Sequence, residues 1–420
     1  MDSGRVYMCF DLKSFYASVE CVERGLDPFK TRLVVADPSR GDRTICLAAT
    51  PAIKALGVKS RCRVYEIPQG IDYIMAPPRM QLYIDYSTRI YGIYLRYAAK
   101  EDIHIYSIDE IFMDATAYMG ARALSPRDFA RAVMRDIFTE TGITATCGIG
   151  SNLYLAKIAL DIISKRSPEF IGELTEDSYR ELLWGHLPLT DFWHISAGTV
   201  KRLKHLGIRT MREIAQADEA VLYKTFGVDA RLLIDHAHGR ESATIADIKA
   251  YMPQSRSLST SQVLHSGYDK AGARLLILEM TELLSLELVK SGMAAGSMSI
   301  TLGYSFSEEI SGAKGSMNLD APTSSTKALL DLAGILYDRI AVREAEVFRL
   351  GICLTRLEAE SVTQYDLFSP AEAQEKERRL QRVLIDIKSK YGKNGIFKGM
   401  DLLDGATTIE RNRQIGGHMA

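Results

Sequence analysis

Hydrophobic and polar positions follow two periods along the first 150 residues. The runs 5–11 and 143–149 are short and apolar, as in buried strands, and 103–114 alternates between apolar and polar residues as a β-hairpin does. The resulting strand–helix–hairpin–helix–strand order predicts an α+β domain with a mixed or antiparallel sheet. Within its first helix, Glu20 and Glu23 are expected to face solvent. The helices are expected at 14–24, at 79–100, at 125–141 and from near Ser151 onwards.

The remaining chain divides into further sections. Residues 173–243 have the periodicity of short helices, and 244–253 is expected to be a linker. From 254 to 361, strands alternate with helices, which predicts a second, smaller α+β domain. The tail, 362–420, contains a helix that ends at Gly392, and its polar, glycine-rich end is expected to be mobile. In the second α+β domain, strands are expected at 256–264, 296–306 and 347–356, and helices at 270–291 and 323–341.

Composition restricts the class of protein more than its function. The chain has 420 residues, 46% of them hydrophobic and 25% charged, with a formal net charge of -1, which is ordinary for a globular protein of several domains. Its six cysteines include no CxxC pair, so neither a zinc site nor a disulfide framework is expected. The chain lacks an apolar run that could cross a bilayer and a signal peptide at its start, so we expect a cytoplasmic protein with no membrane partner.

Three carboxylates stand at the ends of apolar strands, Asp11 after the first strand and Asp109 with Glu110 in the hairpin. On one regular strand Asp109 and Glu110 would point to opposite faces, so we expect a turn or bulge beside them. Like charges in a dry site repel, and two divalent cations would remove that repulsion. Such a pair of ions also suits in-line phosphoryl transfer. For any one of these residues taken singly, a surface acid at a strand end is the more common alternative.

The segments around these acids carry a family resemblance. They read VYMCFDLKSFY from Val6, YSIDE from Tyr106 and CGIGSNLYLAK from Cys147. Together they resemble the Y-family (translesion) DNA polymerases, in the UmuC/DinB-like branch, over nearly the whole chain. The resemblance implies a multidomain α+β fold: a right-hand polymerase with a ferredoxin-like palm, small fingers, a helical thumb, an α+β little-finger domain and a C-terminal tail. It places the palm at 1–28 and 79–172, the fingers at 29–78, the helix-hairpin-helix thumb at 173–243, the linker at 244–253, the little finger at 254–361 and a tail with a clamp-binding peptide and a helix at 362–420.

The activity implied by this resemblance is DNA-templated DNA synthesis of low fidelity, which serves damage tolerance. The primer 3′-OH would attack the α-phosphate of a dNTP, and pyrophosphate would leave. Asp11, Asp109 and Glu110 would be the catalytic carboxylates. With the backbone carbonyl of Leu12 they would hold two Mg²⁺ ions per active site, with Mn²⁺ able to substitute. Two rival classes stay open: a catalytically inactive DNA- and clamp-binding accessory protein, and a nucleotidyl cyclase-like enzyme.

Two aromatic residues are expected beside the nucleotide. Phe15 and Tyr16 open the helix that follows Asp11. By resemblance, Tyr16 is a steric gate, a ring under the sugar that leaves no room for a 2′-OH. For Phe15, a place in the core is the competing interpretation.

Positive partners for the triphosphate are expected at Lys54 and Lys165. Relatives also place a tyrosine hydroxyl there, but that position falls on Pro51, which has neither a hydroxyl nor an N–H. The later lysine is ambiguous by one residue, because 161–165 carries an apparent insertion. We favour Lys165 and expect Lys157 to be structural or to face DNA.

DNA contacts are expected in two places. The turn before residue 200 resembles a helix-hairpin-helix, which offers backbone N–H groups to a phosphate, although its His-Ile-Ser-Ala-Gly sequence departs from the family pattern. The second place is a strand rich in serine and threonine in the later α+β domain. A solvated basic surface is the alternative for each side chain. The expected contact residues are Ser196, Gly198, Lys201, Arg202, Lys204 and Arg256.

The peptide Gln-Tyr-Asp-Leu-Phe at 364–368 resembles the QxxLF-type motif by which bacterial polymerases dock on the sliding clamp. Leu367 and Phe368 would fill an apolar pocket while Gln364 satisfies a polar rim. The alternative is a short clip that packs the tail helix onto the body of the protein. The partners expected overall are primer-template DNA, dNTP and this clamp, with the oligomeric state left open.

Overall fold

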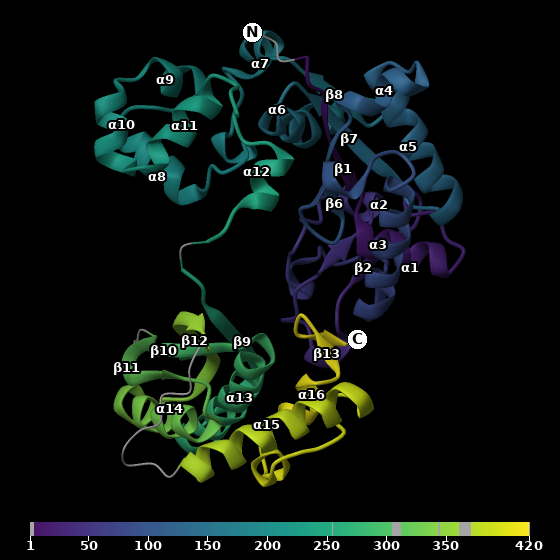
Figure 1. Ribbon diagram of the computed structural model, residues 1–420. Coiled ribbons are helices and arrows are strands. Elements are labelled where there is room, and N and C mark those ends of the chain that lie inside the picture. The colour runs from purple at the N-terminus through teal and green to yellow at the C-terminus, as the bar shows by residue number, and fades with distance from the viewer. Residues whose placement is uncertain (1–3, 254, 305–311, 343–344, 361–370, 420) are drawn as a thin grey trace. The chain divides into compact units, whose positions relative to one another are not determined.

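The computed structural model describes residues 4–419, except for 254, 305–311, 343–344 and 361–370. The chain forms two compact units, Met1–Tyr251 and Met252–Ala420, which are purple to teal and green to yellow in Figure 1. Helices and sheets occur in both, as the α+β interpretation predicts. None of the helices in these described residues combines the length and the apolarity needed to cross a membrane.

The first unit is built on a sheet of strands β1 (Tyr7–Leu12), β5 (Ile103–Ile105), β6 (Glu110–Asp114), β7 (Ala145–Gly150) and β8 (Ile171–Leu174). Their order is β5-β6-β1-β7-β8. Neighbours pair antiparallel except for β7 and β8, which are parallel. The predicted mixed sheet and the predicted hairpin are therefore both confirmed, and β1 lies at the centre of the sheet.

Helices cover both faces of this sheet: α1 (Phe15–Glu23), α3 (Met80–Tyr94), α4 (Thr116–Arg122), α5 (Pro126–Thr141) and α6 (Leu153–Ile158). Alternate residues of β1 face opposite layers, as a strand requires. The Phe10 ring lies 5.5 Å from the ring of Tyr94 in α3, whereas Cys9 packs in a cluster with Leu153 of α6. Asp11, two residues after Cys9, therefore shares the α6 face of the sheet.

Two glycines let α6 approach the sheet closely. A Cβ on Gly148 would lie 2.1 Å from the carbonyl oxygen of Ala156, and one on Gly150 would lie 2.3 Å from the Ala156 nitrogen. Both contacts are with backbone, which cannot rotate away. Glycine at these positions of β7 brings the helix that carries Lys157 down onto the strand that carries Asp11.

Residues between α1 and α3 form a small sheet of their own. Strand β2 (Leu33–Val35) pairs antiparallel with β3 (Ala48–Ala49) and parallel with β4 (Ile74–Ala76). Helix α2 (Pro51–Lys54) follows β3, and Ile53 of this helix belongs to a separate apolar cluster that fills this subdomain. These strands and α2 lie within residues 29–78.

The next section is helical, as predicted: α7 (Glu176–Leu183), α8 (Ala197–His205), α9 (Met211–Gln216), α10 (Glu219–Phe226) and α11 (Asp229–Ala237). Thr210 and Glu213 form a capping box at the start of α9. The segment 244–253, expected to be a linker, contains α12 (Ile245–Ala250), and the first unit ends just after it, at Tyr251. Ile245 is 3% exposed in an apolar cluster with Cys9 and Leu153, and Lys249 donates to the carbonyl of Lys100, so this segment is anchored to the first unit.

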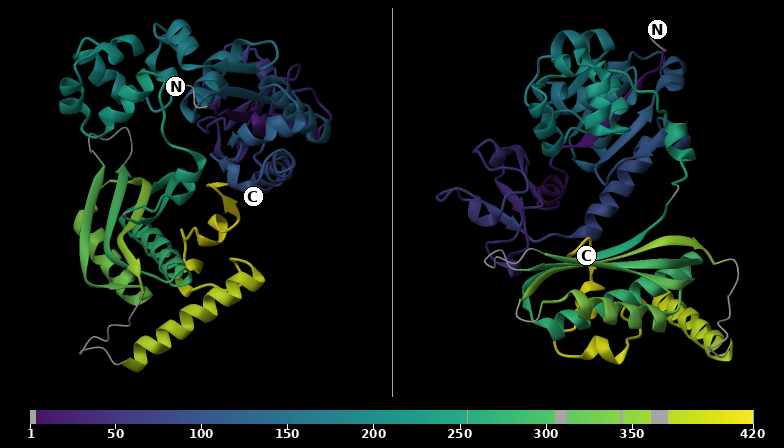
Figure 2. Two further views of the ribbon diagram at one scale, coloured as in Figure 1. Left: turned by 45° about the horizontal axis from the view of Figure 1, so that its top comes forward. Right: turned by 90° about the vertical axis from the view of Figure 1, so that its left-hand side faces the viewer.

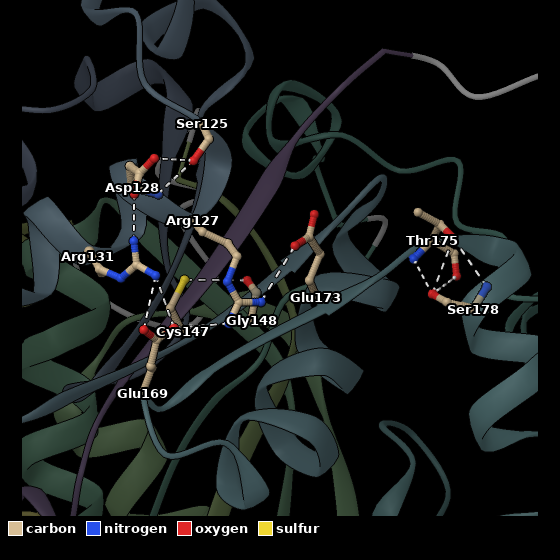
Figure 3. Close-up of polar contacts among 10 residues, drawn as sticks. All are labelled: Ser125, Arg127, Asp128, Arg131, Cys147, Gly148, Glu169, Glu173, Thr175 and Ser178. Carbon is tan, nitrogen blue, oxygen red and sulfur yellow. Dashed lines mark hydrogen bonds and ion pairs between the residues drawn. The ribbon is translucent and has the colours of Figure 1, made fainter.

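An ion-pair network joins the start of α5 to the segment at β8 (Figure 3). Arg131 contacts Glu169 at 3.0 Å, and Arg127 contacts Glu169 at 3.2 Å and Glu173 at 3.8 Å. Each of these side chains is two-fifths exposed or more, so each pair stabilises the fold by at most about 1 kcal/mol. Beside the network, Thr175 and Ser178 cap the start of α7 in Figure 3.

The second unit contains a sheet of β9 (Leu258–Tyr268), β10 (Met293–Tyr304), β11 (Ala313–Thr323) and β12 (Val347–Ala359), in the antiparallel order β11-β10-β12-β9. Helices α13 (Lys270–Ser291) and α14 (Thr326–Ile340) pack on one face around a shared apolar core (Figure 2). The other face carries hydroxyl side chains of β9 and β10 around a groove of ≈ 230 Å³. Strand β11 was not among the expected strands.

The tail also differs from the expectation. As predicted, helix α15 (Ala371–Tyr391) ends just before Gly392, which has a φ of 90°. The chain then turns back through η7 (Gly399–Leu402), α16 (Thr408–Arg411) and the hairpin β13 (Gln414–Ile415) and β14 (His418–Met419). The fully buried Glu279 of α13 accepts the N–H groups of Thr407 at 3.0 Å and Thr408 at 3.1 Å. The end of the chain, expected to be mobile, is thus folded onto α13.

Candidate active site

The turn between β5 and β6 carries two of the three acids to the end of β1. Asp109 is the last residue of this turn, and its carbonyl accepts the N–H of Leu12 at 2.9 Å. Glu110 opens β6 and pairs directly across from Asp11. Directly opposed residues of neighbouring strands share a face, so the two side chains lie together. The turn expected beside Asp109 and Glu110 is present, and acids about a hundred residues apart in the sequence meet.

Asp11 shows the electrostatic strain of this arrangement. Burial, reinforced by the charges of Asp109 and Glu110, raises the pKa of Asp11 to about 7. Lys157 opposes the rise but does not cancel it. A carboxyl group in this state gains from any cation that replaces its proton.

Glu110 already has a cation beside it. Its Oε1 lies 2.7 Å from Nζ of Lys157 and accepts the Cys9 thiol at 3.2 Å, and its side chain is 9% exposed. Lys157 also contacts Asp161 at 3.0 Å. Although burial acts in the opposite direction, these acidic neighbours raise the pKa of Lys157, so the ammonium stays charged. Of the two roles expected for Lys157, structural or facing DNA, this buried ion pair agrees with the structural one.

The donor chemistry of the three carboxylates suits a hard divalent cation, which prefers oxygen ligands. In the part of the chain that the structure describes, no three acidic, histidine or cysteine groups already stand in a metal-holding arrangement. At Glu110, Lys157 and Cys9 both contact the same oxygen, Oε1. The residues fit the ion by chemistry, and Glu110 is held in an ion pair within the protein.

Besides Lys157, three further lysines lie near Asp11: Lys13, Lys54 and Lys165. Lys54 donates from Nζ to Ser14 Oγ at 2.9 Å, and Lys13 Nζ lies 4.4 Å from the ring centroid of Phe170. Burial and the nearby charge of Lys13 lower the pKa of Lys54. The charge of Lys165 lowers the pKa of both Lys13 and Lys54. Sequence reasoning missed Lys13, although its place two residues after Asp11 is a signal that could have identified it. The lysines form a cationic cluster with Asp11 as a nearby counter-charge, which is suited to a polyanion.

The apparent insertion at 161–165 has a structural counterpart. The helix that begins as α6 continues as a π-helical turn, η4 (Ala159–Ile163), before a 3-10 turn at Ser164–Arg166. A π-turn accommodates one extra residue without breaking the helix. It thereby changes the direction in which the following residues point. Lys165 follows it and is exposed, with Nζ 3.9 Å from Asp161.

The two aromatics at the start of α1 differ in exposure. Phe15 is 2% exposed, which leaves almost no surface for a nucleotide and agrees with its alternative interpretation as a core residue. Tyr16 is half-buried and stacks on Tyr83 of α3 with ring centroids 4.4 Å apart. Pro51 is the first residue of α2 and offers no hydrogen-bond donor to a ligand.

The residues expected to contact DNA lie on the surface of both units. Ser196 caps α8 by accepting the Thr199 N–H at 3.2 Å, and His194, in the altered turn, has a φ of 67°. Gly198, Lys201 and Lys204 on α8 are exposed. Arg202 is exposed too, but its guanidinium lies 4.4 Å from the centroid of the Phe226 ring.

The other two predicted contacts belong to the second unit. Arg256 is exposed just before β9, close in sequence to the Ser259 and Ser261 side of the hydroxyl-lined groove. The clamp-type peptide with Gln364, Leu367 and Phe368 lies outside the described residues.

Comparison with known proteins assigns the chain to a family. Two family models match: impB/mucB/samB family at residues 10–161 and impB/mucB/samB family C-terminal domain at 255–367. The putative UV-damage repair protein UvrX of Bacillus subtilis (strain 168) is 31% identical to this chain. The alignment covers 98% of this chain and 97% of UvrX. A DNA polymerase IV 2 of the same organism is 28% identical over the full length of both chains.

A solved structure shows the same fold. The Y-family DNA polymerase chimera Dbh-Dpo4-Dbh superposes with a TM-score of 0.64 at 20% identity, covering 84% of this chain and 99% of its own. The multidomain α+β polymerase fold expected from the sequence is thereby confirmed. With family models that match more than half of the residues and a relative similar over nearly its whole length, the chain belongs to the impB/mucB/samB family, the UmuC/DinB-like branch of the Y-family DNA polymerases.

Proposed function

We propose that this protein is a DNA-templated DNA polymerase that adds dNTPs to a primer 3′-OH and copies damaged templates. The observation that carries the proposal is the meeting of Asp11, Asp109 and Glu110 at one end of the sheet, beside a cluster of lysines. Membership of the family supports it, as do relatives whose names refer to UV-damage repair and to DNA polymerase IV. On this proposal, the first unit holds palm, fingers and thumb, and the second holds the little finger and the tail.

The acids would hold divalent metal ions. Asp11, Asp109, Glu110 and the carbonyl of Leu12 are the proposed ligands for two Mg²⁺, with Mn²⁺ as a substitute. When bound, such ions neutralise the phosphates and activate the attacking oxygen. The pKa of Asp11, about 7, implies that cation binding there releases a proton near neutral pH.

The protein groups have separate tasks around the nucleotide. The ammonium groups of Lys13, Lys54 and Lys165 would bind the triphosphate, so that the cluster supplies charge where Pro51 supplies no donor. The ring of Tyr16 would lie under the sugar and exclude a 2′-OH. Lys157 holds Glu110 in place through its ion pair.

DNA would be held by phosphate contacts that do not read sequence. The candidates are the N-terminal turn of α8, with Ser196 and Gly198, and the exposed Lys201, Arg202 and Lys204 behind it. In the second unit, Arg256 and the hydroxyl-rich face of β9 form a further candidate surface.

Charge-reversing substitutions at Lys201 and Lys204 should weaken DNA binding to all sequences alike, and unchanged affinity at low salt would exclude these two contacts.

Asp109→Ala is expected to abolish primer extension, because the variant loses a proposed metal ligand. The loss should be on the order of 10³-fold or more in single-turnover rate, as for groups that stabilise the transition state directly. The assay is extension of a primed template with Mg²⁺, on an undamaged and a damaged strand. Binding of the primed template by fluorescence anisotropy should be retained, which separates loss of chemistry from loss of folding. Wild-type protein that extends neither template would favour the accessory-protein alternative, and cyclic nucleotide formed instead would favour the cyclase-like one.

Asp11→Asn is expected to abolish extension and to raise the melting temperature of the protein in a chelating buffer at pH 8. Because the folded-state pKa of Asp11 is about 7, above the unfolded value of about 4, its ionisation destabilises the folded state progressively as pH rises from about 4 to 7. The stabilisation by asparagine should therefore be small at pH 5 and larger at pH 8. Thermal unfolding at both pH values measures it, with the exposed Asp85→Asn on α3 as control. An equal effect at both values would contradict the charge repulsion described for this site.

Lys13→Ala is expected to raise the KM for dNTP about tenfold or more, because a charge-assisted contact with phosphate is lost. The effect on kcat should be smaller if the contact acts mainly in binding. Steady-state incorporation of a single dNTP measures both constants. Lys30→Ala is the matched control, since Lys30 is an exposed lysine whose Nζ lies 3.7 Å from the carboxylate of Asp27. Equal KM values for Lys13→Ala and wild type would remove Lys13 from the site.

We also propose that Gln364, Leu367 and Phe368 bind a bacterial sliding clamp. The double variant Leu367→Ala/Phe368→Ala is expected to weaken clamp binding about tenfold or more, because both side chains would be anchors in one apolar pocket. Surface plasmon resonance against immobilised clamp measures it, and extension without clamp should stay unchanged. Tyr365→Ala, between the proposed anchors, is the control. Undiminished clamp binding by the double variant would show that this peptide is not the docking motif.

A further inference from the structure

The half-buried ring of Tyr16 rests on a second ring. Tyr83 of α3 lies under it, with a centroid distance of 4.4 Å and an angle of 14° between the ring planes. Tyr83 itself has no exposed surface. Because packed interiors leave few voids, the Tyr16 ring can move toward the interior only if the Tyr83 ring moves as well. The position of the inner ring therefore limits that of the outer one.

Tyr83 is in turn fixed by a buried carboxylate. Its hydroxyl donates to Glu20 Oε1 at 2.8 Å, and Glu20, on the same helix as Tyr16, is fully buried. Arg79 binds both oxygens of Glu20, from Nε at 2.9 Å and from Nη2 at 2.8 Å, and the guanidinium of Arg24 contacts the same carboxylate. The expectation that Glu20 faces solvent was wrong. Although burial opposes it, these hydrogen bonds lower the pKa of Glu20, so the group stays ionised.

A contact whose task was only to hold α1 against α3 would not need this arrangement. One turn further along both helices, Tyr86 donates to Glu23 Oε1 at 2.7 Å, and there the carboxylate lies in solvent. A buried carboxylate with several partners is costly to desolvate and is commonly no more stabilising than an apolar pair. What it adds is direction: a hydroxyl bonded to an immobile carboxylate fixes where its ring lies.

We propose that Tyr83, Glu20 and Arg79 are positioning residues for Tyr16, and that they set how strongly the enzyme rejects ribonucleotides. The inference rests on the proposed function, in which the Tyr16 ring lies under the sugar. A ring that excludes one extra oxygen must be held to a fraction of that oxygen's size. Stacking on Tyr83 fixes the height of the Tyr16 ring, and the Tyr83–Glu20–Arg79 bonds fix the height of Tyr83.

The experiment compares two variants that each remove one tyrosine hydroxyl between α3 and α1. Tyr83→Phe and Tyr86→Phe are measured for kcat and KM with a dNTP and with the rNTP of the same base on a primed template. Tyr83→Phe should lower the ratio of kcat/KM for dNTP over rNTP several-fold, and Tyr83→Leu, which also removes the stacked ring, about tenfold or more. The change should come from better use of rNTP. Tyr86→Phe should keep the wild-type ratio, because it does not contact Tyr16.

Tyr16→Ala is the reference variant that separates this inference from the proposed function. If Tyr16→Ala lowers the ratio but Tyr83→Phe and Tyr83→Leu both match wild type, the positioning role is overturned and the role of Tyr16 under the sugar stands. If Tyr16→Ala leaves the ratio unchanged, the proposed place of Tyr16 under the sugar fails, and the positioning role fails with it. Thermal unfolding of each variant accompanies the kinetics. Should Tyr83→Leu not fold, Tyr83→Phe decides, since Arg79 still satisfies the Glu20 oxygen that loses the hydroxyl.

Discussion

Repulsion among carboxylates at one end of the central sheet is the constraint around which the first unit is organised. Asp11 and Glu110 are directly opposed on paired strands, and Asp109, just before β6, lies close enough to the end of β1 for its carbonyl to accept the Leu12 N–H. Such an arrangement would open the sheet unless positive charge were supplied. The close approach of α6, which glycines of β7 allow, supplies part of it by placing Lys157 beside Glu110. Asp11 receives less compensation, as its pKa of about 7 shows.

The same need for charge explains the lysines on the other side of the acids. Ammonium groups whose pKa is lowered by burial and by one another are unfavourable in the free protein. They become favourable once a polyanion lies between them. The π-turn after α6 belongs to this arrangement, because it lets the same helix carry Lys157 inward and then present Lys165 outward. The proposed metal ligands and the lysines proposed to bind phosphate thus lie next to each other, as phosphoryl transfer requires.

The sequence was sufficient to predict structure where one strong hydrophobic pattern determined it. It was insufficient where a contact with a residue far along the chain determined the structure. Apolar strands and a hairpin predicted the mixed sheet and the meeting of the acids. Strand β11 was missed because most of its residues are polar or small. Its partly buried and exposed positions alternate, but too few of the partly buried residues are large and apolar to give a clear strand pattern. Glu20 reads as a surface residue on a helical wheel, but its burial depends on Arg79 and Tyr83, which are 59 and 63 positions away along the chain. The folded chain end has the same cause, since its anchor, Glu279, lies in a distant helix.

Lys157 bears on whether Glu110 can serve as a ligand at all. An ion pair that used both oxygens of this carboxylate would compete with any cation for it. Both contacts found among the described residues, from Lys157 and from the Cys9 thiol, go to Oε1. They orient the carboxylate without engaging Oε2. A divalent ion bound through Oε2 would leave the ammonium in place, and Asp161 on the far side of Lys157 would hold that ammonium against the repulsion between the two cations.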